Sequence, residues 1–200
     1  MTAGIAVVTA AVSLLLLATG LEIGAIEGGF IPARTGMLAD HPFLLPVWIT
    51  PLTATLVHGG IAHLALNLVM FVFCGQQVER ALGPKALVLL YVVGAYAAAL
   101  GQWAMDPAST GPMIGASGAI SAIIAAYALL YGERRARRLG PLSADLVHAL
   151  WLGAAWIGIQ LLMGVAGIGG VTIAIGAHIG GFVAGLLMAR PLLLWRYRHA

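Results

Sequence analysis

Six apolar runs separated by short polar connectors dominate the chain. They cover residues 3–26, 56–75, 86–105, 115–131, 144–165 and 171–189. A helix needs about 20 apolar residues, with a range of roughly 17 to 25, to cross a bilayer. The pattern therefore predicts an all-α membrane protein. We expect a bundle of six transmembrane helices that forms a single domain over residues 1–200.

The stretch between the first two runs, residues 27–55, has a different pattern. It contains prolines at positions 32, 42, 46 and 51, which exclude one continuous helix. The segment 43–49 within it is nevertheless strongly apolar. We expect an interfacial loop between the first and second helices that is partly immersed in the headgroup layer.

Composition supports a membrane protein. Hydrophobic residues make up 61% of the chain and charged residues 8%, whereas roughly a quarter of the residues of a soluble domain are charged. A soluble chain of 200 residues has too small an interior to bury so much apolar surface. The net charge of +3 is the difference between ten basic and seven acidic residues. So few basic residues do not indicate a nucleic-acid-binding protein.

The basic residues predict the orientation of the bundle. With six spans, the connectors after the second and fourth runs lie on the same side as both chain ends, and this side holds nine of the ten Lys and Arg residues. They are Arg80, Lys85, Arg134, Arg135, Arg137, Arg138, Arg190, Arg196 and Arg198. The exception is Arg34. Basic residues concentrate on the cytoplasmic side of membrane proteins, so we expect both termini to be cytoplasmic.

Polar side chains occur near the outer ends of three runs. His58, His63 and Asn67 lie in the second run, Ser117 in the fourth and His178 in the sixth. At a rise of 1.5 Å per residue, these positions fall within roughly 10 to 15 Å of the outer boundary. Polar groups inside a membrane are costly unless they meet each other or water. Their matching depth indicates a functional site.

Small residues favour close contact between the fourth and sixth runs. The fourth begins with the sequence GASGA at 115–119, and the sixth contains Gly181 and Gly185 at a spacing of four. Such spacings let two helix backbones approach closely, which predicts a hydrogen bond between the Ser117 hydroxyl and the His178 ring. No acidic residue lies in the second, fourth or sixth run, so we expect a Ser-His dyad rather than a triad.

His63 and Asn67 are four residues apart and share one helix face. Together with the backbone N–H of Ser117, they are candidates for an oxyanion hole. A zinc site formed by His58, His63 and His178 is a weaker alternative. The spacing of five between the first two places them about 140° apart on a regular helix, and no H-E-x-x-H motif is present.

Each of these features also has a simpler interpretation. A GASGA sequence by itself is more often a helix-packing motif than a nucleophile. A single histidine in a membrane is often a structural hydrogen-bonding group or part of an ion path. The combination of a serine, a histidine and a His/Asn pair at one depth favours catalysis.

Four motifs in this order resemble the rhomboid family of intramembrane serine proteases. They are LVHGGIAHLALN at 56–67, VERALG at 78–83, GASG at 115–118 and AHIGGFVAG at 177–185. One departure is Ser121, which stands where the family usually has an aromatic residue. Another is Ile49, which follows Trp48 where the family often has arginine.

The resemblance implies a role for each candidate residue. Ser117 would attack the scissile carbonyl and His178 would act as the base. His63, Asn67 and the Ser117 N–H would hold the oxyanion, with His58 and Gly115 supporting the site. Substrates would be single-pass transmembrane proteins, cut near the outer face without a cofactor.

The resemblance also implies a bacterial inner-membrane location, and water entry through a cavity gated by the loop after the fifth run. The main alternative is a catalytically silent rhomboid relative that binds transmembrane helices. A channel or transporter is less consistent with the sequence, because charged groups within the spans or an inverted repeat would be expected.

Overall fold

The computed structural model describes residues 1–36, 44–132, 137–166 and 174–198. Within these ranges the chain forms α-helices, two short 3-10 helices and no β-strand. The helices are α1 (Thr2–Thr19), α2 (Leu21–Gly28), α3 (Thr50–Thr53), α4 (Ile61–Leu82), α5 (Pro84–Met105), α6 (Ser117–Tyr131), α7 (Ala144–Ala166) and α8 (Ile175–Arg196). The 3-10 helices are η1 (Pro32–Gly36) and η2 (Ala54–Leu56).

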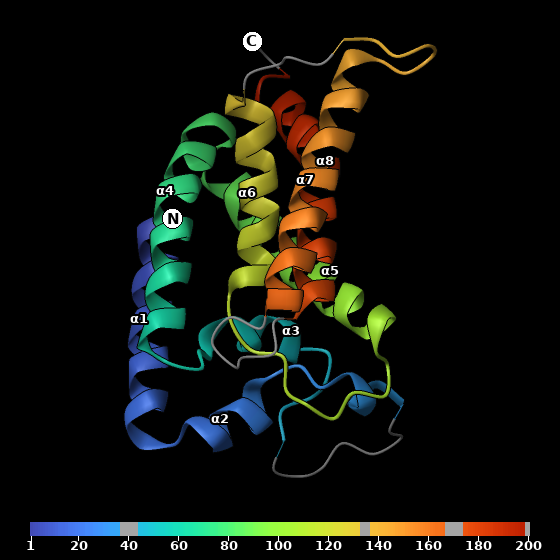
Figure 1. Ribbon diagram of the computed structural model, residues 1–200. Helices are drawn as coiled ribbons and strands as arrows, with labels where there is room; N and C mark the ends of the chain where they lie inside the picture. The colour runs from blue at the N-terminus through green and yellow to red at the C-terminus, as the bar shows by residue number, and fades with distance from the viewer. Residues whose placement is uncertain (37–43, 133–136, 167–173, 199–200) are drawn as a thin grey trace.

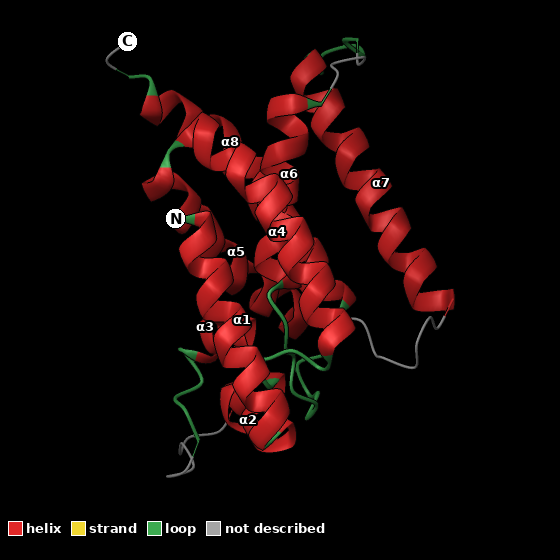
Figure 2. Cartoon of the chain, turned by 90° about the vertical axis from the view of Figure 1, so that its left-hand side faces the viewer, coloured by secondary structure: helices red, strands yellow, loops and turns green. Residues whose placement is uncertain are grey.

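The long helices alternate in direction. Figure 1 shows α4, α6 and α8 running upward, whereas α1, α5 and α7 run downward. The first turns of α4, α6 and α8 therefore lie at the same end of the bundle, near α2 and α3. Helix α7 lies at the edge of the bundle (Figure 2) and packs mainly against α8.

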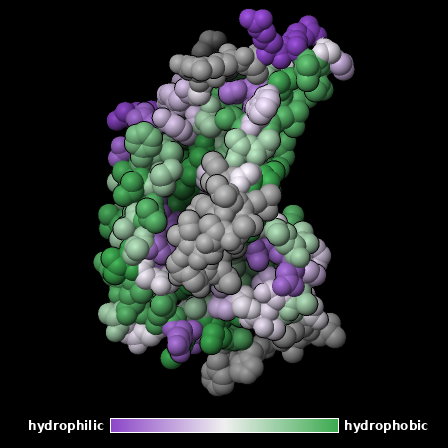
Figure 3. Space-filling view, viewed as in Figure 1, coloured by the Kyte–Doolittle hydropathy of each residue, from purple (hydrophilic) through white to green (hydrophobic). Residues whose placement is uncertain are grey.

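Among the described residues, four helices are long and apolar enough to cross a membrane: α1, α4, α5 and α8. Helix α6, with 15 residues, and the stretch Ala144–Gly158 of α7 are apolar but shorter. Large apolar side chains such as Leu66 and Leu187 are 68% and 70% exposed, as expected for a lipid-facing surface. Figure 3 shows apolar side chains over the flanks and hydrophilic ones gathered above the start of α7. The all-helical class is confirmed, and the count of six spans stays a prediction.

Three of the segments predicted within the first 85 residues differ from the structure. The first run, 3–26, is divided at Gly20 into α1 and α2. The second run, 56–75, becomes helical only at Ile61, because Gly60 has a φ of +151° that a helix cannot contain. The predicted connector 76–85 is largely helical, since α4 continues to Leu82. Gly83, with a φ of +87°, then separates α4 from α5.

The extension of α4 brings Glu79 into a helix rather than a connector. Its carboxylate accepts hydrogen bonds from the backbone N–H of Thr2 at 2.8 Å and from the Thr2 hydroxyl at 2.6 Å. These contacts hold the start of α1 against α4. The sixth run also ends later than predicted, because α8 continues through Pro191 to Arg196.

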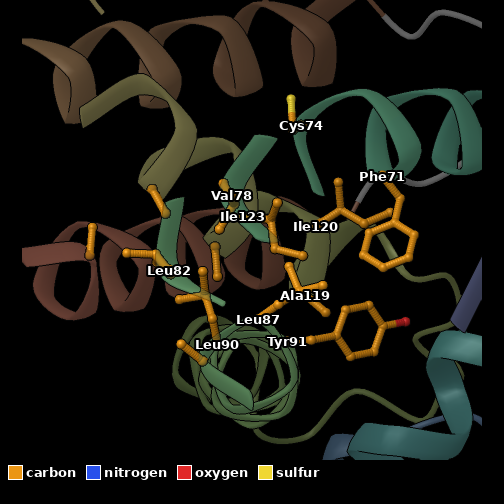
Figure 4. Close-up of a cluster of buried hydrophobic side chains, with 14 of the residues drawn as sticks. Phe71, Cys74, Val78, Leu82, Leu87, Leu90, Tyr91, Ala119, Ile120 and Ile123 are labelled. Atoms are coloured by element: carbon orange, nitrogen blue, oxygen red, sulfur yellow. The ribbon is translucent and has the colours of Figure 1, made fainter. Parts of the chain in front are cut away.

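The hydrophobic core lies between α4, α5, α6 and α8 (Figure 4). Val78, Leu87, Leu90 and Ile123 are fully buried in it. Helix α6 contacts α4, α5 and α8 and is the central element. This position holds the first residue of α6, Ser117, within the bundle.

Glycines set the close packing of α8. A Cβ on Gly181 would collide with the carbonyl oxygen of Gly118, and one on Gly185 with that of Ala122. The predicted close contact between the fourth and sixth runs is therefore present. A second close contact, which was not predicted, places Gly180 of α8 against the carbonyl oxygen of Ala97 in α5.

The segment between α2 and α4 is anchored by hydrogen bonds to its carbonyl oxygens. Arg34 Nη2 donates to Leu45 O at 2.7 Å, and the Tyr96 hydroxyl donates to Trp48 O at 3.0 Å. Tyr96 belongs to α5, so it ties this segment to the bundle even though Ile49 follows Trp48. Residues 37–43 lie outside the described ranges, and the interfacial position of the loop stays a prediction.

Candidate active site

Ser117 and His178 meet where α6 and α8 begin. Ser117 is the first residue of α6, and His178 is the fourth of α8. The Ser117 Oγ lies 2.7 Å from the His178 Nε2, a short hydrogen bond. The glycine contacts along α6 and α8 allow this distance, because larger side chains would separate the two helices.

The backbone of the loop before Ser117 is held by hydrogen bonds at three residues, Met113, Gly115 and Ala116. Met113 exchanges two backbone hydrogen bonds with Phe30, at 2.8 and 3.0 Å. The Gly115 N–H donates to Ala54 O at 2.9 Å, and the Ala116 N–H donates to the His58 Nε2 at 3.3 Å. The position of the serine therefore depends on residues far away in the chain.

His58 is fully buried, and its hydrogen bonds determine its tautomer. Its Nε2 accepts a hydrogen bond from the Ala116 N–H. The Ser13 hydroxyl donates to Leu56 O at 2.8 Å, which leaves the Ser13 oxygen to accept from His58 Nδ1 at 2.9 Å. A neutral imidazole protonated on Nδ1 satisfies all three contacts. His58 therefore supports the loop that carries Ser117.

His63 has the opposite tautomer. Its Nδ1 accepts a hydrogen bond from the Gly59 N–H at 3.3 Å, so a neutral ring carries its proton on Nε2. The edge of the ring that carries the Nε2–H faces Gly115. A Cβ on Gly115 would lie 2.8 Å from the His63 Nε2 and 3.8 Å from the Ser117 Oγ. His63 and Ser117 thus border the same space above Gly115.

Asn67 lies one turn after His63 and is only 6% exposed. Its side-chain Nδ2 donates to the His63 carbonyl oxygen at 2.8 Å. It lines a small cavity with Ala116, the residue before the serine. Asn67 therefore lies close to the loop that precedes Ser117, and one of its two amide protons is used in a hydrogen bond to the backbone of α4.

His58 and His63 do not share a helix, so the predicted angle of about 140° between them is wrong: His58 precedes α4 and does not lie on it. The His58 and His63 ring centroids are 5.0 Å apart. Among the described residues, no group of three or more His, Cys, Asp or Glu side chains is placed to hold a metal ion.

Ser121, the second serine of α6, has a different environment. It is 1% exposed, and its hydroxyl donates to the Ser117 carbonyl oxygen at 2.8 Å. Trp156 of α7 donates from Nε1 to the His178 carbonyl oxygen at 3.4 Å and stacks on Phe182 with a centroid distance of 5.0 Å. An aromatic residue from α7 thus packs beside the turn of α8 that carries the histidine.

Ser13 and Trp156 were not among the residues predicted from the sequence. A signal for Ser13 was present, since it is a polar residue in an apolar run, the same feature that identified the other candidates. Trp156 had no such signal, because a tryptophan in an apolar helix is ordinary.

The start of α6 provides further donors. The first N–H groups of a helix have no partner within it and carry a partial positive charge. Ser117 and Gly118 occupy these positions and line a cavity of about 10 Å³. A carbonyl oxygen that gained negative charge at this point would meet donors already in place.

Comparison with known proteins agrees with this geometry. The family model described as Rhomboid domain matches residues 46–195, and all four sequence motifs lie within this region. The chain belongs to the rhomboid family. Its membership and its long apolar helices make this rhomboid chain an integral membrane protein.

Similar relatives are named Rhomboid protease GlpG. The one from Serratia proteamaculans (strain 568) is 32% identical over 145 residues, which are 72% of this chain and 46% of the relative. The one from Yersinia pestis (strain Pestoides F) is 33% identical over 135 residues, which are 66% of this chain and 44% of the relative. The one from Yersinia enterocolitica (serotype O:8) is 28% identical over 183 residues, which are 90% of this chain and 61% of the relative. The chain thus spans about half the length of the relatives it matches.

Proposed function

We propose that this rhomboid-family chain is an intramembrane serine endopeptidase in which Ser117 and His178 form the catalytic dyad. The observation that carries the proposal is the 2.7 Å distance between the Ser117 Oγ and the His178 Nε2. Serine is a weak nucleophile unless a neighbouring base removes its proton. The names of the relatives, all rhomboid proteases, support the same activity.

In the first step, His178 Nε2 takes the Ser117 proton while Oγ attacks the scissile carbonyl carbon. The resulting imidazolium then gives this proton to the leaving amine as the peptide bond breaks. The product is an acyl-serine. A water molecule, deprotonated by His178, attacks this ester and releases the carboxylate product, which restores the serine hydroxyl.

The oxyanion formed in each attack would be stabilised by His63, Asn67 and the backbone N–H of Ser117. The His63 tautomer supports this role, because its Nε2–H faces Gly115 and borders the space beside the Ser117 Oγ. The backbone N–H belongs to the first turn of α6, where it has no helical partner. Asn67 retains a second amide proton beyond the one given to the His63 carbonyl. Gly115 and His58 keep the loop in position.

We propose single-pass transmembrane proteins as substrates, cut near the outer face, with no cofactor. The whole chain would form one domain of six spans in a bacterial inner membrane, with both ends cytoplasmic. The concentration of Lys and Arg on one side supports the orientation. Water would enter by the loop after α7, and residues 167–173 of that loop lie outside the described ranges.

The test uses purified protein, a model single-pass substrate and a fluorophosphonate probe. Ser117→Ala should abolish both cleavage and labelling. His178→Ala should abolish cleavage, because the serine loses its base. Ser121→Ala should retain both, since its hydroxyl donates to the Ser117 carbonyl oxygen rather than to a side chain of the dyad. Inactivity of a folded Ser121→Ala while Ser117→Ala kept full activity would overturn the nucleophile assignment.

The oxyanion assignment has its own test. Removal of one donor typically lowers the rate by about 10² to 10³, and by less when other donors share the charge. Asn67→Ala should therefore slow turnover while the probe still labels Ser117. His63→Ala should be at least as damaging. Normal turnover in the double variant would remove both residues from the oxyanion hole. A wild-type protein that neither labels nor cleaves would instead be a catalytically silent relative.

A further inference from the structure

A second cavity lies between α1, α4, α5 and the start of α6, and Ala116, the residue before Ser117, is among its lining residues. Thr9, Asn67 and Tyr91 line it together with apolar side chains. About 10 Å³ of it is open to the centre of a water-sized sphere. A cavity of about 10 to 15 Å³ by this measure holds one water molecule, provided that polar groups are present to bind it.

Two of the residues that line this cavity each have a buried polar atom with no hydrogen-bond partner among the described residues. These atoms are the Asn67 Oδ1 and the Tyr91 hydroxyl oxygen. Asn67 is 6% exposed and Tyr91 is 7% exposed, so both are more than nine-tenths buried. Buried polar groups almost always hydrogen-bond to protein or to ordered water. Two such atoms beside one cavity indicate a shared partner.

The surroundings of Tyr91 agree with a partner in this cavity. Its ring packs against Phe71 with a centroid distance of 5.4 Å. Figure 4 shows both rings at one edge of the core, with the Tyr91 oxygen directed away from the aliphatic side chains. The Thr9 and Thr55 hydroxyls are polar neighbours of this oxygen, but none of the described residues forms a hydrogen bond with it. Thr9 also lines the cavity, so a water in it would have both the phenol and a second hydroxyl beside it.

We propose that this cavity binds one water molecule that bridges the Tyr91 hydroxyl and the Asn67 Oδ1, and that Tyr91 is a positioning residue for Asn67. The phenol O–H donates to the water, and the water donates to the amide oxygen. Thr9 also lines the cavity and would provide a third contact. Three polar partners are typical of a buried water.

The bridge determines which way the Asn67 amide faces. The reverse orientation would place the amide oxygen against the His63 carbonyl oxygen, to which Nδ2 now donates. With the oxygen held by the water and one N–H held by His63, the second N–H has a defined direction. This inference rests on the proposed role of Asn67 as an oxyanion donor. Tyr91 would then contribute to turnover without touching the substrate.

Tyr91→Phe tests the inference, because it removes only the hydroxyl and keeps the ring that packs on Phe71. The kcat should fall by roughly 3- to 10-fold, the effect of one ordinary hydrogen bond. The KM should be unchanged, since Tyr91 does not contact the substrate. The matched control is Tyr131→Phe, which removes a hydroxyl that donates to Gln77 O at 3.0 Å at the opposite end of α6. Its kcat should equal that of the wild type.

A double variant separates positioning from general loss of stability. If Tyr91 acts through Asn67, then Asn67→Ala combined with Tyr91→Phe should be no slower than Asn67→Ala alone. Multiplicative losses would overturn the inference, as would a normal kcat for Tyr91→Phe when Asn67→Ala is slow. If Asn67→Ala itself has normal turnover, the oxyanion role of Asn67 fails and the positioning role of Tyr91 fails with it.

A direct observation tests the water whatever the kinetics show. A high-resolution crystal structure of the wild-type protein should contain a water within about 3.2 Å of both the Asn67 Oδ1 and the Tyr91 oxygen. The same water should be lost or displaced in Tyr91→Phe. A wild-type structure with no density between these two atoms would overturn the bridge, even if the dyad proved fully active.

Discussion

Substitution of Gly115 by alanine should impair catalysis without breaking the Ser117–His178 pair. Gly115 has a φ of +106°, a region that residues with a Cβ rarely adopt. Its added Cβ would lie 2.7 Å from the His63 Cε1 and 2.8 Å from the His63 Nε2. The change therefore acts on the proposed oxyanion donor rather than on the nucleophile or base.

The size of the effect follows from these distances. Non-bonded carbon atoms prefer a separation of about 3.5 to 4.0 Å, so a contact of 2.7 Å is short by about 1 Å. The His63 ring has to retreat by about that amount or the loop has to shift. A displacement of 1 Å in a catalytic group costs roughly 10² in rate. We expect the kcat of Gly115→Ala to fall about 100-fold. Backbone strain adds about 1 to 2 kcal/mol of destabilisation.

The assay is cleavage of a single-pass substrate by purified protein, with thermal unfolding measured in parallel. Two glycines separate the causes. Gly111 lies in the same loop, and a Cβ added to it would lie 3.9 Å from the Ser109 Oγ, an ordinary contact distance. Gly111→Ala should therefore behave as the wild type. Gly140→Ala has a positive φ of +58° but open space around it. It should lose stability without losing kcat in the folded fraction.

A Gly115→Ala protein that folds and retains kcat within about twofold would refute the reasoning, since a 1 Å shift of a catalytic donor cannot be silent. The refutation would apply to the position of His63 as an oxyanion donor. The dyad itself would be unaffected, because its own test depends on Ser117 and His178.

Three further outcomes are expected. Gly181→Ala should lower the free energy of unfolding by about 1 to 3 kcal/mol, because its Cβ has no room at the α6–α8 contact. Gly158→Ala, with open space, should leave the unfolding temperature unchanged. Ser13→Ala should destabilise the protein by about 1 kcal/mol, because it removes the acceptor of a buried imidazole. In a cysteine-free background, a cysteine at Ser109 should react with an impermeant reagent only from outside, and one at Leu139 only from the cytoplasm. The reverse pattern would overturn the topology.

Local features of the sequence predicted the helical membrane class, the regions of the long helices and the rhomboid resemblance. Apolar runs predict helices because a bilayer requires every backbone polar group to be satisfied within its own segment. The α5 and α7 boundaries agree with the runs 86–105 and 144–165 to within two residues. Ser117 and His178 were identified for the same reason, since polar groups in apolar runs are few and conspicuous.

Helix ends were predicted less well, because hydropathy does not report the backbone conformation. The pair Gly59 and Gly60 is as compatible with an apolar run as alanine would be, yet the positive φ of Gly60 delays α4 until Ile61. This delay removes His58 from the helix. It allows the His58 ring to turn toward Ala116 and Ser13, which no helical spacing predicts.

The tertiary structure alone decided how the site is supported. Ser13, His58 and Ala116 are far apart in the chain and are joined because α1 packs beside η2 and α4, and α4 packs beside α6. The pairing of Tyr91 with Asn67 across one cavity likewise requires α4 and α5 to be placed side by side. Hydrophobic periodicity reports which residues lie within a membrane. It carries no information on which of them face one another, because the packing of small residues against neighbouring backbones sets that choice.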